Sequence, residues 1–253
     1  MKISKAAINN FAFRCFRTTA DRDYIHARLA FRSNLFPQFQ WSSLHCLEKY
    51  VKCILLLNRI KGKKYKHEIK KPIERINREA PFQIEISKGT KKFIQHLESG
   101  ARYRYLEVSW INYGYQLKEL DRAVFEIRKY CQILTQSIKS NGKEVQLLNY
   151  NLKRINEIKP PCGKNGGIIG GWLERVLDKD DHPARGALIW KNLWFGSSNR
   201  KQVMVDEIFA SENSPLWQCP EIIDEVTKYV FLPKEIATDC RERANNKGSI
   251  KAS

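Results

Sequence analysis

Apolar side chains recur every three or four residues along most of the first 140 residues, which is the spacing of one helical face. The clearest stripe has successive intervals of 3, 4, 3, 4 and 3 and comprises Leu117, Leu120, Val124, Ile127, Cys131 and Leu134. A stripe of this kind is typical of a helix packed in a bundle. Lys118, Arg122 and Arg128 lie off the stripe, and we expect them to face solvent or a ligand.

Similar stripes predict further helices before this one. The first begins at a cap formed by Thr18 or Thr19 and ends before Pro37, because proline disfavours helix at the preceding residue. A longer helix follows over about 38–59, and a third begins near His67. The fold class is therefore predicted to be mostly α, an antiparallel helical bundle.

Residues 1–140 are expected to form this bundle, and residues 141–253 a helical C-terminal extension. Two prolines and five glycines between residues 159 and 171 predict a hinge near 163–171. Beyond it, helical patterns return over 172–177, 184–195 and 220–231. The last ten residues are expected to be frayed.

Basic residues outnumber acidic ones by 45 to 27, giving a formal net charge of +18. Residues 1–200 hold 38 basic and 18 acidic side chains, a net of +20, whereas residues 201–253 have 7 and 9, a net of −2. Such an uneven excess favours a polyanionic partner, and nucleic acid is the first candidate. The alternative is charge that serves solubility alone. The 11% aromatic content is too high for a disordered chain.

Two basic segments could contact that partner. The first is lysine-rich and is either a phosphate-binding segment or a solvated loop. The second combines arginine with tyrosine and could stack unpaired bases, although its aromatic rings could instead seal one end of the bundle. Two arginines that lie off the stripe of residues 117–134 are added to these segments. The predicted nucleic-acid-binding residues are Lys61, Lys63, Lys64, Lys66, His67, Arg102, Arg104, Tyr105, Arg122 and Arg128.

The seven cysteines are odd in number and include no C-x-x-C pair, which favours buried reduced thiols over disulfides or a zinc site. No Ser/His/Asp set, carboxylate pair or metal-ligand cluster emerges, so no metal and no cofactor are expected. His45 and Glu48 are spaced to share a helical face with Lys52, which allows a small polar pocket.

Apolar runs are too short to span a membrane, and the N-terminus lacks the apolar core of a signal peptide. We therefore expect a soluble cytoplasmic protein without a membrane partner.

Residues 20–29, read with residues 38–52, resemble the HEPN family (higher eukaryotes and prokaryotes nucleotide-binding domain). The family's Glu-Lys-x-x-Lys motif matches Glu48-Lys49-Tyr50-Val51-Lys52, and its following His-acidic-aliphatic step matches His67-Glu68-Ile69. The resemblance covers about residues 18–135. It implies an antiparallel bundle that usually forms a homodimer, and relatives that are RNA-cleaving toxins, partners of nucleotidyltransferases or binding modules.

RNA-cleaving members of that family have four to six residues between an arginine and a following histidine. Arg22 is too close to His26, and Arg59 is too far from His67. Arg175 and His182 have six residues between them, although Val176 replaces the usual polar residue. By this resemblance Arg175 would hold the phosphate and His182 would assist proton transfer at the 2′-hydroxyl.

Three functions follow as expectations. The first is binding of RNA or a nucleotide through a basic groove, as a homodimer in a toxin–antitoxin or phage-defence setting. The second is a metal-independent endoribonuclease that uses Arg175 and His182. The third is a helical protein-interaction module that pairs with another chain. An antitoxin or a nucleotidyltransferase is a candidate partner of the protein.

Overall fold

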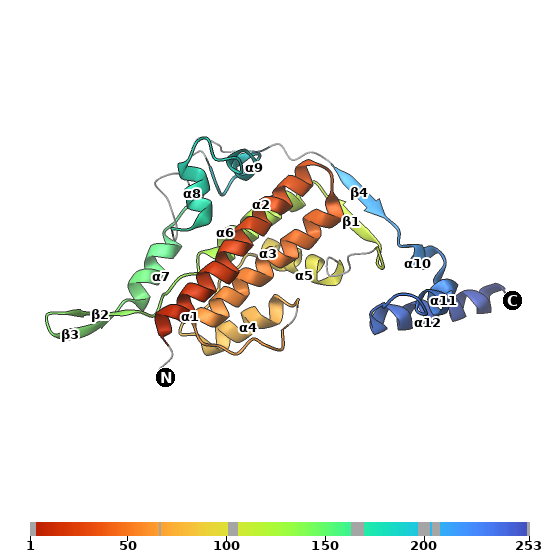
Figure 1. The fold of residues 1–253 in the computed structure, drawn as a ribbon, viewed down its shortest axis with the longest axis horizontal. Coiled ribbons are helices and arrows are strands. Elements are labelled where there is room, and N and C mark those ends of the chain that lie inside the picture. The colour runs from red at the N-terminus through yellow and green to blue at the C-terminus, as the bar shows by residue number, and fades with distance from the viewer. Residues whose placement is uncertain are drawn as a thin grey trace.

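The computed structural model describes residues 4–65, 67–100, 106–162, 170–196, 203 and 208–251. Most of this chain is helical, which confirms the predicted mostly α class (Figure 1). None of the helices in these ranges is both long enough and apolar enough to cross a membrane.

The first rod of the bundle is longer than predicted. Helix α1 (Lys5–Phe11), the π-helical segment η1 (Ala12–Arg17) and helix α2 (Thr18–Arg32) follow one another without a break. The predicted cap at Thr18 or Thr19 is wrong, because the chain is already helical there. The Thr19 hydroxyl donates backwards, to the Cys15 carbonyl at 2.6 Å.

Helix α2 ends because Asn34 adopts a left-handed backbone conformation, with φ of 58°. The Leu35 N–H then donates to the Ala30 carbonyl at 2.8 Å and closes the helix end. Pro37 does not end α2 but lies in the first turn of α3 (Phe36–Leu57), where its missing N–H leaves no bond unmade. Helices α2 and α3 therefore lie side by side and antiparallel (Figure 1).

Helices α4 (Lys70–Glu79), α5 (Lys88–Gly100) and α6 (Gln116–Arg128) complete the bundle around α3. The predicted stripe on α6 is buried along its whole length, as expected. The helix itself ends at Arg128, so Cys131 and Leu134 reach the core from the turns that follow.

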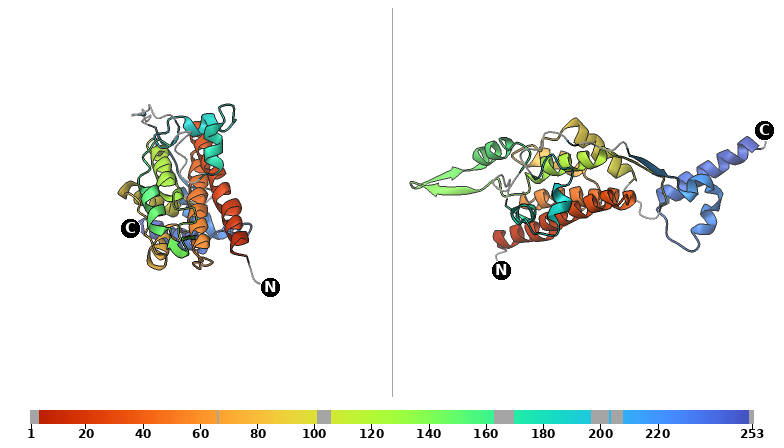
Figure 2. Two further views of the ribbon diagram at one scale, coloured as in Figure 1. Left: turned by 90° about the vertical axis from the view of Figure 1, so that its left-hand side faces the viewer. Right: turned by 90° about the horizontal axis from the view of Figure 1, so that it is seen from above.

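The C-terminal half begins with a hairpin that was not predicted. Strands β2 (Ser137–Ser140) and β3 (Lys143–Gln146) pair antiparallel and project from one end of the molecule (Figure 2). Helices α7 (Leu148–Asn156), α8 (Trp172–Asp178) and α9 (Arg185–Ile189) follow. Their apolar side chains join the bundle core, which therefore continues through Phe195, well beyond the boundary expected at residue 140.

A small second unit lies at the opposite end of the molecule (Figure 2). It contains α10 (Pro215–Gln218), η2 (Pro220–Ile222), α11 (Ile223–Val226) and α12 (Lys234–Lys251). Its own core consists of Leu216, Ile223, Ile236, Ala237 and Cys240. Because α12 continues through Lys251, part of the segment expected to be frayed is helical.

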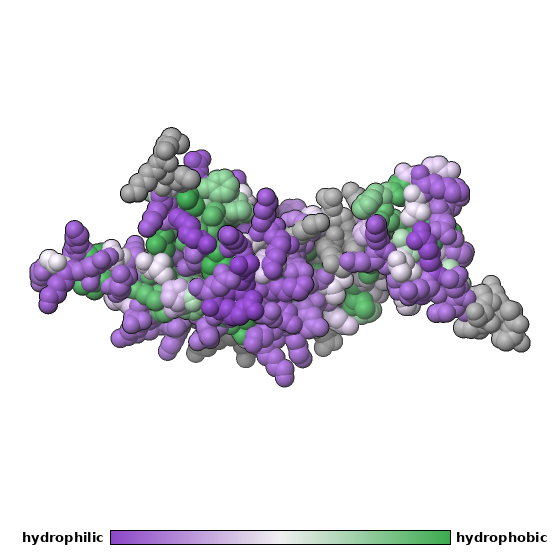
Figure 3. All heavy atoms as spheres, turned by 90° about the horizontal axis from the view of Figure 1, so that it is seen from below, coloured by the Kyte–Doolittle hydropathy of each residue, from purple (hydrophilic) through white to green (hydrophobic). Residues whose placement is uncertain are grey.

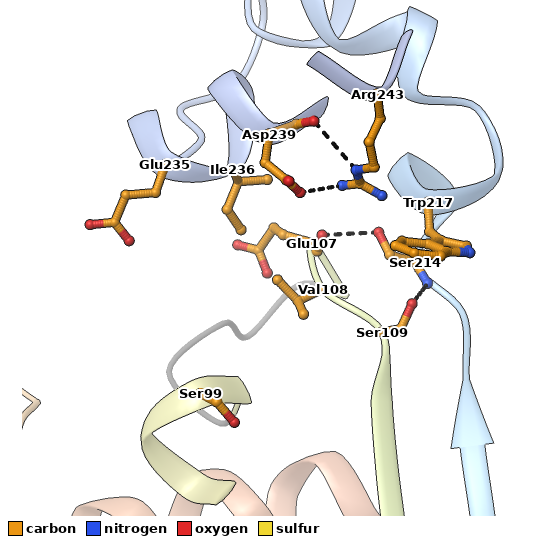
Figure 4. Close-up of a pocket in the computed structure, with 10 residues that line it drawn as sticks. All are labelled: Ser99, Glu107, Val108, Ser109, Ser214, Trp217, Glu235, Ile236, Asp239 and Arg243. Carbon is orange, nitrogen blue, oxygen red and sulfur yellow. Dashed lines mark hydrogen bonds and ion pairs between the residues drawn. The ribbon is translucent and has the colours of Figure 1, made fainter. Parts of the chain in front are cut away.

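A two-stranded ribbon leads from the bundle to this unit. Strand β1 (Trp110–Tyr113) pairs antiparallel with β4 (Phe209–Glu212), so that Trp110 opposes Glu212 and Tyr113 opposes Phe209. Just beyond β4, the Ser214 N–H donates to the Ser109 hydroxyl at 2.9 Å (Figure 4). The ribbon therefore joins two separate hydrophobic cores.

A buried arginine also ties α9 to the bundle. Arg28 on α2 is ion-paired with Asp121 on α6, and its Nε atom donates to the Ala187 carbonyl at 2.8 Å. The Tyr24 hydroxyl donates to the same carboxylate at 2.6 Å. These contacts explain why a segment so late in the chain packs against α2.

Candidate nucleic-acid interface

Two adjoining cavities lie over α4, α5 and the loop before α4. The first has a volume of about 500 Å³ and is lined by Lys64, His67, Glu68, Lys70, Lys71, Glu74 and Glu98. The second, of about 630 Å³, is lined in part by Lys70, Glu74, Glu85, Lys88, Lys91 and Lys92. They adjoin because Lys70 and Glu74 line both.

We name the exposed lysines of these elements the lysine face. Its members are Lys61, Lys63, Lys64, Lys70, Lys71, Lys88, Lys91 and Lys92. Figure 3 views the side of the molecule on which α4 lies and shows hydrophilic side chains across the middle of that side.

The lysine face lies among four glutamates that line the same cavities, Glu68, Glu74, Glu85 and Glu98. Within the ranges that the structure describes, Lys71 is its only ion-paired member, with Nζ 2.7 Å from Glu68 Oε1. The Glu98 carboxylate is occupied instead by the start of α4, where it accepts the Ile69 N–H and, at 3.0 Å, the Lys70 N–H. Seven of its eight lysines therefore have no ion-pair partner among the described residues, although Glu74 and Glu85 lower the net charge of the lining.

A histidine–glutamate cluster borders the first cavity. Glu48 is buried on α3, and its Oε2 atom lies 3.1 Å from His67 Nδ1 and 3.8 Å from His45 Nδ1. Its other oxygen, Oε1, accepts from Lys52 Nζ. The Trp41 ring lies 3.9 Å from the His45 ring, measured between centroids. The expectation that His45, Glu48 and Lys52 share one helical face is thus confirmed.

Burial lowers the pKa of His45, even though the Glu48 carboxylate acts in the opposite direction. The Nε2 atom of His45 is buried and has no hydrogen-bond partner among the described residues. A protonated ring would leave a charged N–H unpaired there, so the neutral imidazole is favoured.

The contact between His67 and Glu48 was missed from sequence, because the two residues are 19 positions apart on different segments. His67 was assigned only to phosphate binding, and no metal-ligand cluster was expected. The structure nevertheless brings one ligand atom each of His45, Glu48 and His67 within 4.8 Å of one another. The only sequence signal was that both motifs of the HEPN resemblance include a member of this group.

Comparisons with protein-family models, curated proteins and solved structures find no match. The HEPN resemblance therefore stays a prediction.

The predicted nucleic-acid-binding residues differ in their exposure and in their contacts. Lys61, Lys63 and Lys64 are exposed on the loop before α4. Lys66 and the segment with Arg102, Arg104 and Tyr105 lie outside the described residues. Arg122 is half-buried, with Nη1 3.0 Å from Glu119 Oε2 and its guanidinium 5.6 Å from the Trp194 ring centroid.

The prediction that Arg128 faces solvent or a ligand is wrong. Its side chain is fully buried, where Nε donates to Asp21 Oδ1 at 2.7 Å and Nη1 to Glu174 Oε1 at 2.6 Å. Burial by itself would lower the pKa of Arg128, but Asp21 and Glu174 outweigh it and raise the pKa well above its usual value. Arg128 therefore pairs with internal carboxylates and is not available to phosphate.

The predicted catalytic residues Arg175 and His182 lie on α8 and just after it. Arg175 is exposed on α8. His182 is half-buried after that helix, and its Nδ1 atom accepts the Ala184 N–H at 3.1 Å. Among the described residues no hydrogen bond joins Arg175 to His182. Their catalytic roles stay predictions.

A third cavity, of about 360 Å³, lies where the C-terminal unit meets the residues before β1 (Figure 4). Its charged side chains are Glu107, Glu235, Asp239 and Arg243. The one arginine donates to Asp239 Oδ2 at 2.6 Å and lies 4.7 Å from the Trp217 ring centroid. Carboxylates dominate this cavity and would repel phosphate, so we do not assign it to nucleic acid.

Proposed function

We propose that the protein binds RNA through the lysine face. The observation that carries the proposal is the set of exposed lysines around the two adjoining cavities, nearly all without an ion pair in the described part of the chain. A lysine that neutralises a phosphate releases the counterions condensed on the nucleic acid, which drives binding at low salt. The charge excess of residues 1–200 supports the same reading.

The HEPN resemblance supports RNA as the ligand and extends the proposal to a homodimer with a role in a toxin–antitoxin or defence system. In that setting the partner would be an antitoxin or a nucleotidyltransferase. These finer statements rest on the Glu48–Lys52 and His67–Ile69 motifs alone.

The test is binding of a short fluorescent single-stranded RNA, measured by anisotropy between about 50 and 200 mM salt. Each phosphate contact contributes a slope of about −0.7 to the plot of log affinity against log salt. A variant with Lys64, Lys91 and Lys92 changed to glutamine removes three charges from the lysine face. We expect weaker binding and a slope that is shallower by about 2, since each contact adds about 0.7.

The matched control changes Lys139, Lys143 and Lys153 to glutamine, which removes the same charge from the β2–β3 hairpin and α7. This control should bind like the wild type. An equal loss of RNA affinity in the two variants would contradict a localised phosphate site. A slope near zero in the salt plot of the wild type would contradict it as well.

A further inference from the structure

We propose that His45, Glu48 and His67 form a binding site for a divalent transition metal ion of the zinc class. This inference concerns α3 and the loop before α4 and does not depend on RNA binding. Two imidazole nitrogens and one carboxylate oxygen are a common ligand set for Zn²⁺ in proteins.

The two distances from Glu48 to the histidine nitrogens are compatible with a tetrahedral ion, and the two nitrogens lie within 4.8 Å of each other. Bonds of 2.0–2.2 Å at tetrahedral angles separate neighbouring ligand atoms by roughly 3.3–3.5 Å. The distances from Glu48 Oε2 to His67 Nδ1 and His45 Nδ1, 3.1 and 3.8 Å, lie on either side of that value. The longer of the two exceeds hydrogen-bond length, so Glu48 and His45 approach each other without making a direct bond.

The surroundings hold the ligands in place. His45 and Glu48 are one turn apart on α3, which is among the best-packed helices of the bundle. Lys52 engages Glu48 Oε1 and leaves Oε2, the atom that faces both histidines, free to coordinate. Trp41 packs against the His45 ring and fixes its plane. The Nε2 atom of His45, which would carry the proton when Nδ1 coordinates, has no hydrogen-bond partner among the described residues, so ring packing and not a hydrogen bond orients this ligand.

The site would be open on one side. The His67 side chain is 47% exposed, whereas that of Glu48 is 4% exposed. Three protein ligands with one position toward solvent are the arrangement of zinc sites that keep a water or a ligand in the fourth position. Because the first cavity includes His67, that position would face the lysine face.

The test uses the full chain with the exposed cysteines removed, Cys15→Ser and Cys219→Ser, so that thiolates do not compete for the metal. After EDTA treatment and buffer exchange, Zn²⁺ is titrated by calorimetry and Co²⁺ by visible absorption. We expect one ion per chain, the intense absorption of four-coordinate Co²⁺, and a rise in the thermal unfolding midpoint with Zn²⁺.

Three variants separate a site from adventitious binding. His67→Ala changes an exposed side chain and should fold normally, and His45→Ala removes the second imidazole. Each should weaken Zn²⁺ at least about tenfold. His26→Ala is the control, since His26 Nδ1 pairs with the Ser42 hydroxyl at 2.7 Å, outside the cluster. Absence of saturable binding, or affinity unchanged in both His67→Ala and His45→Ala, would overturn the proposal.

Discussion

The Nδ1 atom of His67 lies 3.1 Å from the Oε2 atom of Glu48, which joins the loop before α4 to the middle of the bundle. Glu48 is buried and His67 is largely exposed, so the contact runs from the protein interior to the edge of the lysine face. A buried carboxylate is stable only when it is paired, and His67, His45 and Lys52 surround this one. The same contact places a polar cluster beside the first cavity, whose lining includes Lys64, Lys70 and Lys71.

Arg128→Met should destabilise the protein by about 3–5 kcal/mol, because it leaves the Asp21 and Glu174 carboxylates in the interior without their cation. The measurement is urea unfolding followed by circular dichroism. Arg75→Met is the control, since Arg75 pairs with Glu79 at the surface and should cost far less stability than Arg128→Met. Equal losses of unfolding free energy in the two variants would show that the buried ion pairs of Arg128 do not stabilise the fold more than a surface pair does.

Leu120→Ala should cost about 2–5 kcal/mol, because Leu120 is completely buried on α6 and its truncation leaves a cavity. Leu29→Ala makes the same chemical change at a side chain that is 45% exposed and should stay within about 0.5 kcal/mol of the wild type. Chemical unfolding of both variants tests whether the predicted stripe is the core. A loss of unfolding free energy in Leu120→Ala no larger than that in Leu29→Ala would contradict the burial of the α6 stripe in the core.

The stability of the protein should fall as the pH is lowered from about 7.5 to 5.5, in part because of His96. Burial lowers the pKa of His96 below its usual value, and the Gln116 amide donates to His96 Nε2 at 2.9 Å. As the pH falls, the unfolded chain therefore takes up this proton before the folded chain does, which lowers the free energy of unfolding.

Urea unfolding at both pH values measures this effect. His96→Gln should flatten the pH dependence of the free energy of unfolding relative to the wild type. A pH dependence unaltered by His96→Gln would exclude His96 as its source.

In the native state, a thiol reagent should label Cys15 and Cys219 rapidly and the other cysteines slowly. Those two are exposed, whereas Cys46, Cys53, Cys131, Cys162 and Cys240 are buried. Burial also raises the pKa of the Cys162 thiol to about 12, which suppresses its reactive thiolate. Mass spectrometry of peptides after brief alkylation, with a urea-unfolded sample as control, gives the reactivity of each site. Rapid native labelling of Cys162 would contradict its burial.

The sequence by itself determined the helical class and the core face of α6, because a period of three to four residues is a local property of the chain. It also predicted that His45, Glu48 and Lys52 share one face, since residues three and four apart on a helix are neighbours. Helix ends were less predictable. Asn34 ends α2 through a left-handed backbone conformation, and the continuous α1–η1–α2 rod has no cap at Thr18.

Only the tertiary structure decided which charges are available to a partner. Arg122 and Arg128 occupy similar positions in the sequence pattern, yet Arg128 is enclosed by Asp21 and by Glu174, which lies 46 residues further along the chain. The contact between His67 and Glu48 likewise joins residues that are far apart in the sequence, 19 positions in this case. Ionisable side chains pair according to their distance in space and their exposure to water, and neither quantity is encoded in local spacing.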